Sequence, residues 1–224
     1  MKALINKTLR PFGYQITRAN SIPLSYKILN TYRYFHDKFV RIKDVEGDIV
    51  ECGVGFGHTL ILLLYLAEIE GRERTVWGYD SFVGFPEPTI EDKSIRNPKK
   101  GEWNIITPAE IKDIFFRRCQ LPTRAEKNLK LIKGFFRETL PNNAVKKIAM
   151  LHLDVDLYDS YKVCLEFLYS KVEENGIIMF DEYMQKNTQE VFPGAAKAIN
   201  EFFADKQEKI QYDDTFDKYY CVKK

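Results

Sequence analysis

Carboxylates gather in the stretch LHLDVDLYDSY, where Asp154 and Asp156 follow an apolar run. Asp181 and Glu182 directly follow the next apolar run, GIIMF. Carboxylates held close together repel one another unless a cation or a proton lies between them. Four acids with few Lys or Arg nearby in the sequence favour a hard divalent cation such as Mg²⁺, which prefers oxygen ligands. The alternative is a set of unrelated capping residues, as Asp159 would be for the helix that follows it.

A glycine-rich turn, GVGFG, follows the strand-like segment DIVEC, so that Gly53, Gly55 and Gly57 alternate with larger residues. Glycines after a strand allow the backbone to approach a ligand closely and to turn sharply into a helix. The dinucleotide fingerprint is GxGxxG, whereas the third glycine here comes one residue earlier, in the GxGxG pattern of S-adenosylmethionine sites. Glu51, before the first glycine, is suited to receive the ammonium of a methionine moiety. A tight turn that only needs small residues is the alternative.

Two further strand ends carry candidate cofactor contacts. Asp80 and Ser81 end the segment RTVWGYDSF, and a carboxylate after the second strand can accept two ribose hydroxyls. Gly134 and Phe135 end the third strand, where a glycine and an aromatic ring can flank an adenine. Both positions have structural alternatives, an exposed acid that caps a turn and a phenylalanine that belongs to the core.

These candidates must be positioned by strands that alternate with helices, which predicts an α/β domain with a mostly parallel sheet. We expect strands within 48–52, 74–82, 130–136, 147–156 and 176–183, helices within 25–40, 58–70, 108–120, 160–172 and 193–206, and a hairpin over 211–224. Such sheets bind ligands at the carboxyl ends of their strands. The Pro- and charge-rich segment 84–104 is a long loop, a length typical of functional or mobile segments.

The composition excludes several classes of protein. A chain of 224 residues fits one domain with a full core, and a net charge of +2 argues against nucleic acid as a partner. The four cysteines form no CxxC pair, which argues against a zinc site or a disulfide framework. The longest apolar run, LILLLYLA, is too short to span a bilayer, and the first residues do not read as a signal peptide. We therefore expect a cytoplasmic protein without an integral membrane segment.

Six motifs in this order, GDIVECGVGFG, VWGYDSFVGFPEP, GFFRETLP, LHLDVDLYDSY, GIIMFDEY and PGAAKAINEFF, cover residues 47–203. Together they resemble the macrocin O-methyltransferase family, whose members use S-adenosylmethionine and Mg²⁺ to methylate sugar hydroxyls. The resemblance implies an α/β fold, a Rossmann-like seven-stranded methyltransferase sheet with helices on both faces and a C-terminal antiparallel hairpin. We expect this class I methyltransferase domain at 41–224, with an N-terminal helical arm or lid at 1–40.

The resemblance also implies roles for the candidate residues. Its cofactor contacts fall on Glu51, Gly53, Asp80, Ser81 and Gly134. Its metal ligands fall on Asp154, Asp181 and Glu182, with Asp156 as the base or as an additional ligand. The family usually has two aspartates where this chain has Asp181 and Glu182, so either the longer side chain reaches the metal or Glu182 is not a ligand. We expect Asp154 and Asp156 to point to the same side of an extended chain.

The leading hypothesis is therefore methyl transfer to a hydroxyl of a saccharide or other small glycosylated acceptor. The first alternative is a nicotinamide-dependent oxidoreductase on a similar sheet. The glycine spacing counts against it, and although Tyr158 and Lys162 have the YxxxK spacing of such enzymes, they follow directly on the acid cluster. A second alternative, a non-catalytic binding protein, is disfavoured because crowded carboxylates bring nothing to a scaffold. The oligomeric state stays open, a homo-oligomer included.

Overall fold

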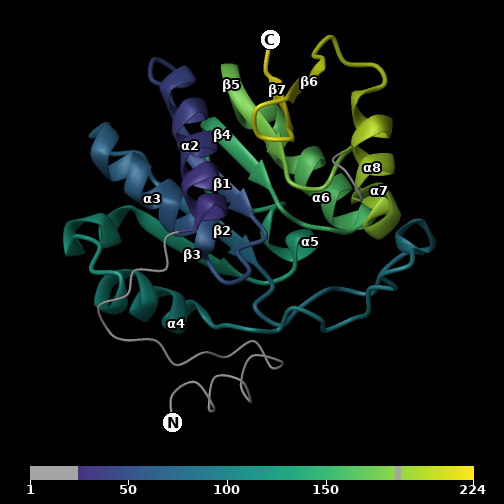
Figure 1. Ribbon diagram of the computed structural model, residues 1–224, viewed down its shortest axis with the longest axis horizontal. Coiled ribbons are helices and arrows are strands. Elements are labelled where there is room, and N and C mark those ends of the chain that lie inside the picture. The colour runs from purple at the N-terminus through teal and green to yellow at the C-terminus, as the bar shows by residue number, and fades with distance from the viewer. Residues whose placement is uncertain (1–24, 185–187) are drawn as a thin grey trace.

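The computed structural model describes residues 25–184 and 188–224 (Figure 1). In these ranges one sheet has the strand order β3-β2-β1-β4-β5-β7-β6. The first five strands of that order are parallel, β7 is antiparallel to β5, and β6 is antiparallel to β7. This confirms the predicted methyltransferase sheet with its C-terminal hairpin. The strands are β1 (Asp48–Cys52), β2 (Val76–Asp80), β3 (Leu129–Lys133), β4 (Ile148–Leu153), β5 (Val172–Phe180), β6 (Ile210–Asp213) and β7 (Lys218–Val222).

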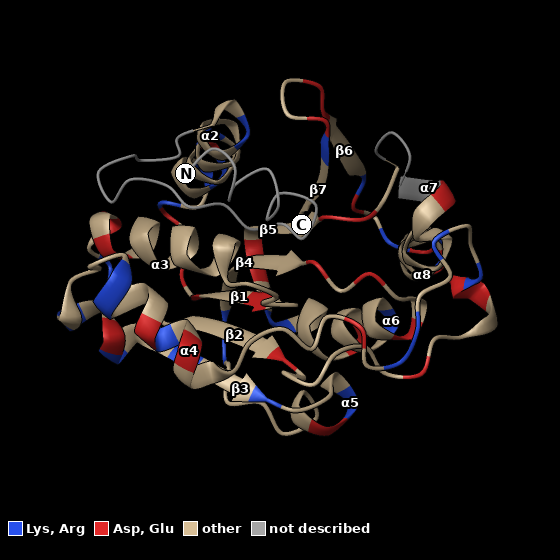
Figure 2. Ribbon diagram, turned by 60° about the horizontal axis from the view of Figure 1, so that its bottom comes forward, with Lys and Arg blue, Asp and Glu red and all other residues tan. Residues whose placement is uncertain are grey.

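Helices cover both faces of the sheet, as the views in Figures 1 and 2 show. They are α2 (Tyr26–Arg41), α3 (His58–Glu70), α4 (Pro108–Lys112), α5 (Phe136–Thr139), α6 (Tyr158–Leu168), α7 (Thr188–Val191) and α8 (Pro193–Phe203). A π-helical segment, Asp113–Arg118, continues α4. Short 3₁₀ turns lie at Ile90–Asp92, Thr123–Asn128 and Tyr169–Lys171.

Alternate residues along the strands point to opposite faces of the sheet and belong to two hydrophobic cores, one on each face. In β5, Ile177 and Met179 belong to the core that α2 and α3 cover, whereas Ile178 and Phe180 belong to the core that α6 and α8 cover. All four side chains are essentially inaccessible to solvent. A strand that is covered on both faces reads as an unbroken apolar run, which is why GIIMF shows no alternation of polar residues.

The predicted helix over 160–172 differs from the structure at both ends. The helix α6 begins earlier, at Tyr158, and ends at Leu168, while β5 already begins at Val172. Between these elements the chain makes a single 3₁₀ turn. The pairing of β5 with β4 shifts register after Val172, so its first residues form an irregular extension that periodicity does not reveal.

The predicted arm over 1–40 is only partly described, because residues 1–24 lie outside the described residues. Its helix α2 buries three aromatic side chains in the first core, namely Tyr34, Phe35 and Phe39. An ion pair of 2.5 Å joins Lys38 of α2 to Asp213 at the end of β6. The helix is thereby fixed to the sheet and to the hairpin, and the action of 1–40 as a lid stays a prediction.

The long loop 84–104 contacts α6, α7 and α8, the helices that follow β4 and β5. Its buried Asp92 accepts a hydrogen bond of 2.7 Å from the backbone N–H of Tyr158, at the start of α6. Gly194, in the first turn of α8, leaves room for the same carboxylate, because a Cβ there would lie 2.2 Å from Oδ1 of Asp92. Ser94 donates to the carbonyl of Val191 at the end of α7. Asp92 thus connects the loop to two helix starts.

No helix among the described residues is both long and apolar enough to cross a membrane.

A buried carboxylate, Glu208, holds the C-terminal end of the chain. Its Oε1 accepts from Nζ of Lys223 at 3.0 Å and from the backbone N–H of Lys224 at 3.3 Å. Burial alone would raise the pKa of Glu208, but the hydrogen bonds from Lys223 and Tyr169 outweigh it and lower the pKa to about 2. The ionised form therefore stabilises the folded state.

We predict that Glu208→Gln lowers the free energy of unfolding at neutral pH by about 1–3 kcal/mol. Because the folded-state pKa is depressed, this contribution is present above the ordinary glutamate pKa and is lost as the pH falls from about 4.5 towards 2. Urea unfolding of the two proteins at several pH values measures the difference. The exposed Glu174→Gln is the control. A difference that does not shrink in acid would contradict this assignment.

Candidate active site

The carboxyl ends of the parallel strands surround a cavity of about 720 Å³. The glycine turn after β1 and the residues that end β2 and β3 line one side of it. Four carboxylates line the other side: Asp154 and Asp156 after β4, and Asp181 and Glu182 after β5. The loop 84–104 contributes Gly84 to Glu87 and Trp103 to the same cavity. The strand order reverses between β1 and β4, so the cavity lies where such sheets bind ligands.

The glycines of the turn serve different purposes. Gly53 has a φ of +86°, and a Cβ there would lie 1.7 Å from the carbonyl oxygen of Asp154, so only glycine lets β1 and β4 come this close. At Gly55, with φ of +50°, a Cβ would meet no atom within 4 Å, so this position borders open space in the cavity. Gly57 does not line the cavity but packs against Ile111, where α3 begins. Two of the three predicted cofactor glycines thus face the cavity.

Asp80 lines the cavity and also shapes the glycine turn. Its Oδ2 accepts hydrogen bonds from the backbone N–H groups of Val54 at 2.8 Å and Gly55 at 3.2 Å. Ser81 lines the cavity too, and its hydroxyl donates to the carbonyl of Gly84 at 2.6 Å. The carboxylate therefore holds the turn in the conformation that opens Gly55 to the cavity, a contribution that the sequence pattern did not predict.

Glu51 lies behind the turn and does not line the cavity. It is fully buried, and its Oε1 lies 3.0 Å from Nδ1 of His152. Burial, followed by the charge of Asp154, raises the pKa of Glu51 well above the usual glutamate value. Its Oε2 has no hydrogen-bond partner among the described residues. His152 is buried as well, and the contact of Glu51 with a cofactor stays a prediction.

At the end of β3, the two predicted adenine contacts differ. Phe135 lines the cavity, together with the neighbouring Phe136. Gly134 does not line it; a Cβ there would lie 2.8 Å from the side chain of Thr139. The aromatic ring is thus the part of this pair that can meet a ligand directly.

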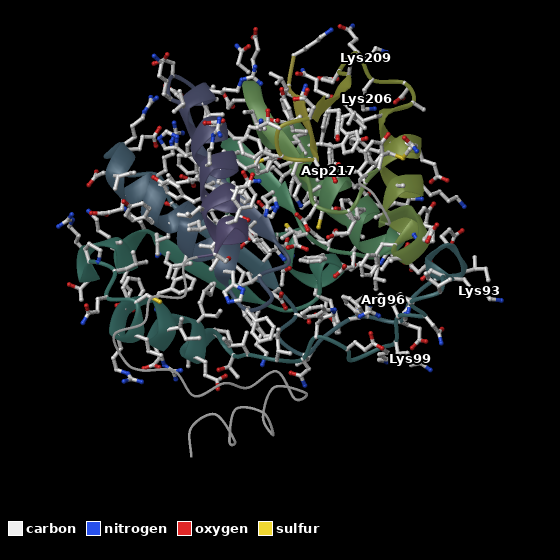
Figure 3. The ribbon with its side chains drawn as sticks, in the orientation of Figure 1. Lys93, Arg96, Lys99, Lys206, Lys209 and Asp217 are labelled. Carbon is white, nitrogen blue, oxygen red and sulfur yellow. The ribbon has the colours of Figure 1, made fainter. Side chains whose placement is uncertain are left out.

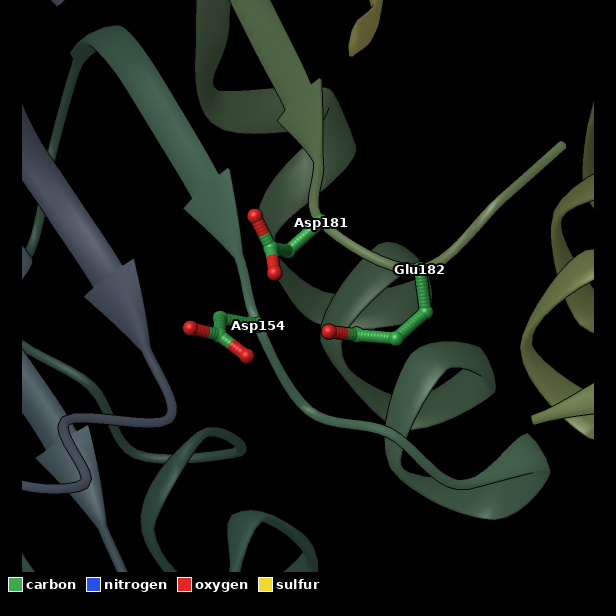
Figure 4. Close-up of side chains that lie close together, drawn as sticks. All are labelled: Asp154, Asp181 and Glu182. Atoms are coloured by element: carbon green, nitrogen blue, oxygen red, sulfur yellow. The ribbon is translucent and has the colours of Figure 1, made fainter. Parts of the chain in front are cut away.

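Asp154, Asp181 and Glu182 converge at the ends of β4 and β5 (Figure 4). One carboxylate oxygen from each lies within 4.8 Å of the others. Burial raises the pKa of Asp154 well above the usual aspartate value, and the charge of Asp181 adds to that shift. Three oxygen donors that lie this close together and repel one another fit a hard divalent cation.

Asp156 adopts a conformation that the sequence did not predict. The strand β4 ends at Leu153, Asp156 has a φ of +58°, and Leu157 N–H donates to the carbonyl of Val155 at 2.5 Å. A hydrogen bond from residue i+2 to residue i around a positive φ describes a γ-turn, which is rare and strained. The expectation of an extended chain from Asp154 to Asp156 is therefore wrong, although both residues line the cavity.

Glu182 connects the acid cluster to this turn. It is buried, and its Oε2 accepts hydrogen bonds from the backbone N–H of Asp156 at 3.1 Å and from the hydroxyl of Tyr161 at 2.9 Å. Burial, followed by the charge of Asp154, raises the pKa of Glu182 well above the usual value. The extra methylene of glutamate lets one side chain support the turn and face the cluster. Tyr161 was missed because a tyrosine on a helix carries no sequence signal of this contact.

Basic groups lie closer to the acids than the sequence suggested. Lys218, at the start of β7, forms an ion pair with Asp181. Burial alone would raise the pKa of Asp181, but Lys218 outweighs it and lowers that pKa. Burial raises the pKa of Asp156 to about 7, against the opposing charge of Arg96. Arg96 belongs to the loop 84–104 and lies inward of Lys93 (Figure 3). Both cations are distant from these acids in the sequence, so sequence proximity did not reveal them.

Comparison with known proteins gives relatives that are O-methyltransferases. The chain is 31% identical over 166 residues to demethyldecarbamoylnovobiocin O-methyltransferase of Streptomyces niveus, covering 72% of this chain and 60% of that protein. It is 27% identical over 189 residues to mycinamicin III 3''-O-methyltransferase of Micromonospora griseorubida, covering 80% of this chain and 68% of that protein. The chain thus spans roughly three fifths to two thirds of the length of these relatives.

Solved structures share the fold. The O-methyltransferase NovP matches with a TM-score of 0.69 and 27% identity, covering 88% of this chain and 79% of its own. The calicheamicin methyltransferase CalS11 matches with a TM-score of 0.77 and 21% identity, covering 89% of this chain and 80% of its own.

The sequence profile of one family matches most of the described chain. It is that of macrocin-O-methyltransferase (TylF), and the match covers residues 28–216, from α2 to the turn between β6 and β7. The match includes the glycine turn, Asp80 and the four acids that follow β4 and β5, namely Asp154, Asp156, Asp181 and Glu182. The chain therefore belongs to the macrocin-O-methyltransferase (TylF) family.

Proposed function

We propose that this chain is an S-adenosylmethionine-dependent O-methyltransferase that methylates a hydroxyl of a sugar or glycosylated acceptor, with Mg²⁺ bound at the acid cluster. The observation that carries the proposal is the cavity itself, which the glycine turn and Asp80 line on one side and four carboxylates line on the other. Family membership supports the reaction class. The O-methyltransferases among the relatives support a sugar or glycosylated acceptor, since the name of one of them includes a rhamnosyl group.

The cofactor half of the cavity is built from three strand ends. Gly55 borders open space after β1, Asp80 ends β2, and Phe135 follows β3. A carboxylate has about four lone-pair sites, and the backbone N–H groups of Val54, Gly55 and Phe82 use three of those of Asp80. About one site is left to accept a ribose hydroxyl. Phe135 offers a ring face for an adenine. The nicotinamide alternative is less favoured, because neither the GxGxG spacing nor the family match supports it.

The metal half fits Mg²⁺ by its donor chemistry. Asp154, Asp181 and Glu182 would hold the ion, since one carboxylate oxygen from each lies within 4.8 Å of the others and Mg²⁺ prefers oxygen ligands. When bound, Mg²⁺ supplies the positive charge that makes a neighbouring hydroxyl more acidic. A sugar hydroxyl is a poor nucleophile until it loses its proton, which is why a methyltransferase for sugars gains from such a site.

Asp156 is suited to take that proton. Asp156 lines the cavity beside the acid cluster, at the centre of the γ-turn. Its backbone N–H donates a hydrogen bond to Glu182, which fixes the turn. A base in a fixed position typically contributes about 10²–10⁴-fold to the rate. The cavity contributes separately by holding the methyl donor and the acceptor oxygen in line. Asp154 and Asp156 thus divide metal binding and proton transfer between them.

Two further features of the proposal concern the setting of the enzyme. Lys27 of α2 lines the cavity, which supports an acceptor-side arm or lid at 1–40. The four cysteines are free thiols, which supports a reducing, cytoplasmic location.

We predict that S-adenosylhomocysteine binds the chain and that Asp80→Ala abolishes or strongly weakens this binding. The variant loses both the acceptor for ribose hydroxyls and the hydrogen bonds that open the glycine turn. Isothermal calorimetry measures the affinity, and the highly exposed Asp44→Ala is the control. Heat of binding with NADH but none with S-adenosylhomocysteine would instead identify an oxidoreductase.

We predict that substitutions of Asp154 and Asp156 change the dependence of activity on Mg²⁺ in different ways. Asp154→Asn should weaken Mg²⁺ affinity, with activity partly recovered at high Mg²⁺, because it removes one ligand. Asp156→Asn should keep Mg²⁺ affinity nearly intact and lower kcat by about 10²–10⁴-fold, because it removes the base.

Mg²⁺ titrations of activity compare the two variants, with an acceptor found by screening glycosides with labelled methyl donor. Rescue of Asp156→Asn instead of Asp154→Asn would reverse the two roles. Full activity of both variants would make the cluster structural.

A further inference from the structure

Strand register places a lysine beside the acid cluster. β5 and β7 are antiparallel, and Phe180 pairs with Tyr219. Continuing this register by one residue sets Asp181 opposite Lys218. Residues directly opposite each other in an antiparallel pair lie on the same face of the sheet and interact. The C-terminal hairpin therefore brings a cation to the strand end that carries two of the candidate metal ligands.

The ammonium of Lys218 interacts directly with the acid cluster. Its Nζ donates to Oδ1 of Asp181, and the two side chains are 31% and 36% exposed. The charges of Glu182 and Asp154 also act on it. The same carboxylate of Asp181 belongs to the group of oxygens that lie within 4.8 Å of one another. One side chain is thus shared between a lysine and the candidate metal site.

We propose that Lys218 is a tethered cation that neutralises the acid cluster without metal and competes with the divalent cation for Asp181. This inference rests on the Mg²⁺ site of the proposed function. An ammonium has the same sign of charge as the metal, so the two repel each other across the shared carboxylate. Lys218 then keeps the metal-free cluster folded and makes the metal exchangeable.

The opposite role would be that of a positioning residue. Groups behind metal ligands commonly orient them, and removal of such a partner weakens metal binding by about 10–100-fold. A partner behind a carboxylate ligand must donate a hydrogen bond to it, and Lys218 differs from a neutral donor because it carries a full positive charge close to the ion. The proposal is that repulsion between these two close positive charges exceeds the gain from orientation. The sign of the change in metal affinity separates the two roles.

The test measures metal binding directly. Mn²⁺ serves as the probe, because the paramagnetic resonance signal of the free ion reports binding without any turnover. The purified full chain is compared with Lys218→Met, which keeps most of the side-chain length and removes the charge. We expect Lys218→Met to bind Mn²⁺ about tenfold more tightly or better. Calorimetry with Mg²⁺ at the same near-neutral pH should show the same order.

Two further variants serve as controls, one for the loss of charge at position 218 and one for the loss of a lysine elsewhere on the surface. Lys218→Arg keeps the positive charge and should not tighten binding. Lys209→Met removes an exposed lysine near the start of β6 (Figure 3) and should leave the affinity unchanged. If Lys218→Met does not fold, Lys218→Gln provides the same comparison, with thermal unfolding as the check on folding.

The outcomes separate this inference from the proposed function. Mn²⁺ binding by the original chain that Lys218→Met leaves unchanged or weakens overturns the competing role and leaves the metal site intact. Tighter binding that disappears when Asp154→Asn is added supports the role at this cluster. Binding by Lys218→Met alone also supports it, because the lysine then excludes the ion. Absence of binding in both proteins overturns the metal site and the inference together.

Discussion

Repulsion between the carboxylates at the ends of β4 and β5 is the interaction around which this part of the molecule is arranged. Asp154, Asp181 and Glu182 lie too close together to carry three charges in a partly buried site without compensation. Nearby groups reduce the repulsion: the ammonium of Lys218, the hydroxyl of Tyr161 and the backbone N–H of Asp156. Each comes from a different part of the chain, so the folded core is needed to hold the acids together.

The parallel sheet brings the two halves of the cavity together. The strands β1 to β5 all run in the same direction. The glycine turn, Asp80 and the acids therefore meet at the carboxyl ends of these strands, although they are far apart in sequence. Close approach of β1 and β4 at Gly53 then sets the distance between the glycine turn and the acids. In the proposed reaction this distance matters, since methyl donor and acceptor must lie in line.

Sequence patterns predicted the strands, the hairpin and the ends at which the candidate residues lie, because buried parallel strands and glycine turns have strong local signatures. They did not predict the γ-turn at Asp156. This strained turn is held by a hydrogen bond to Glu182, a residue that is distant in the sequence. They also missed Lys218, whose position depends on the register between β5 and β7. Local patterns carry information about elements, whereas these contacts arise only when distant elements pack.

The attachment of the loop 84–104 has a consequence for engineering. Loops that border an acceptor cavity are natural pieces to exchange between related enzymes when a new substrate is wanted. Here Asp92 inside the loop caps α6 and fits against Gly194 of α8, so the loop and the two helix starts form one mechanical unit. A transplanted loop would need its own partner for the α6 start and a small residue at the α8 start. Exchange of the whole unit is the smaller perturbation.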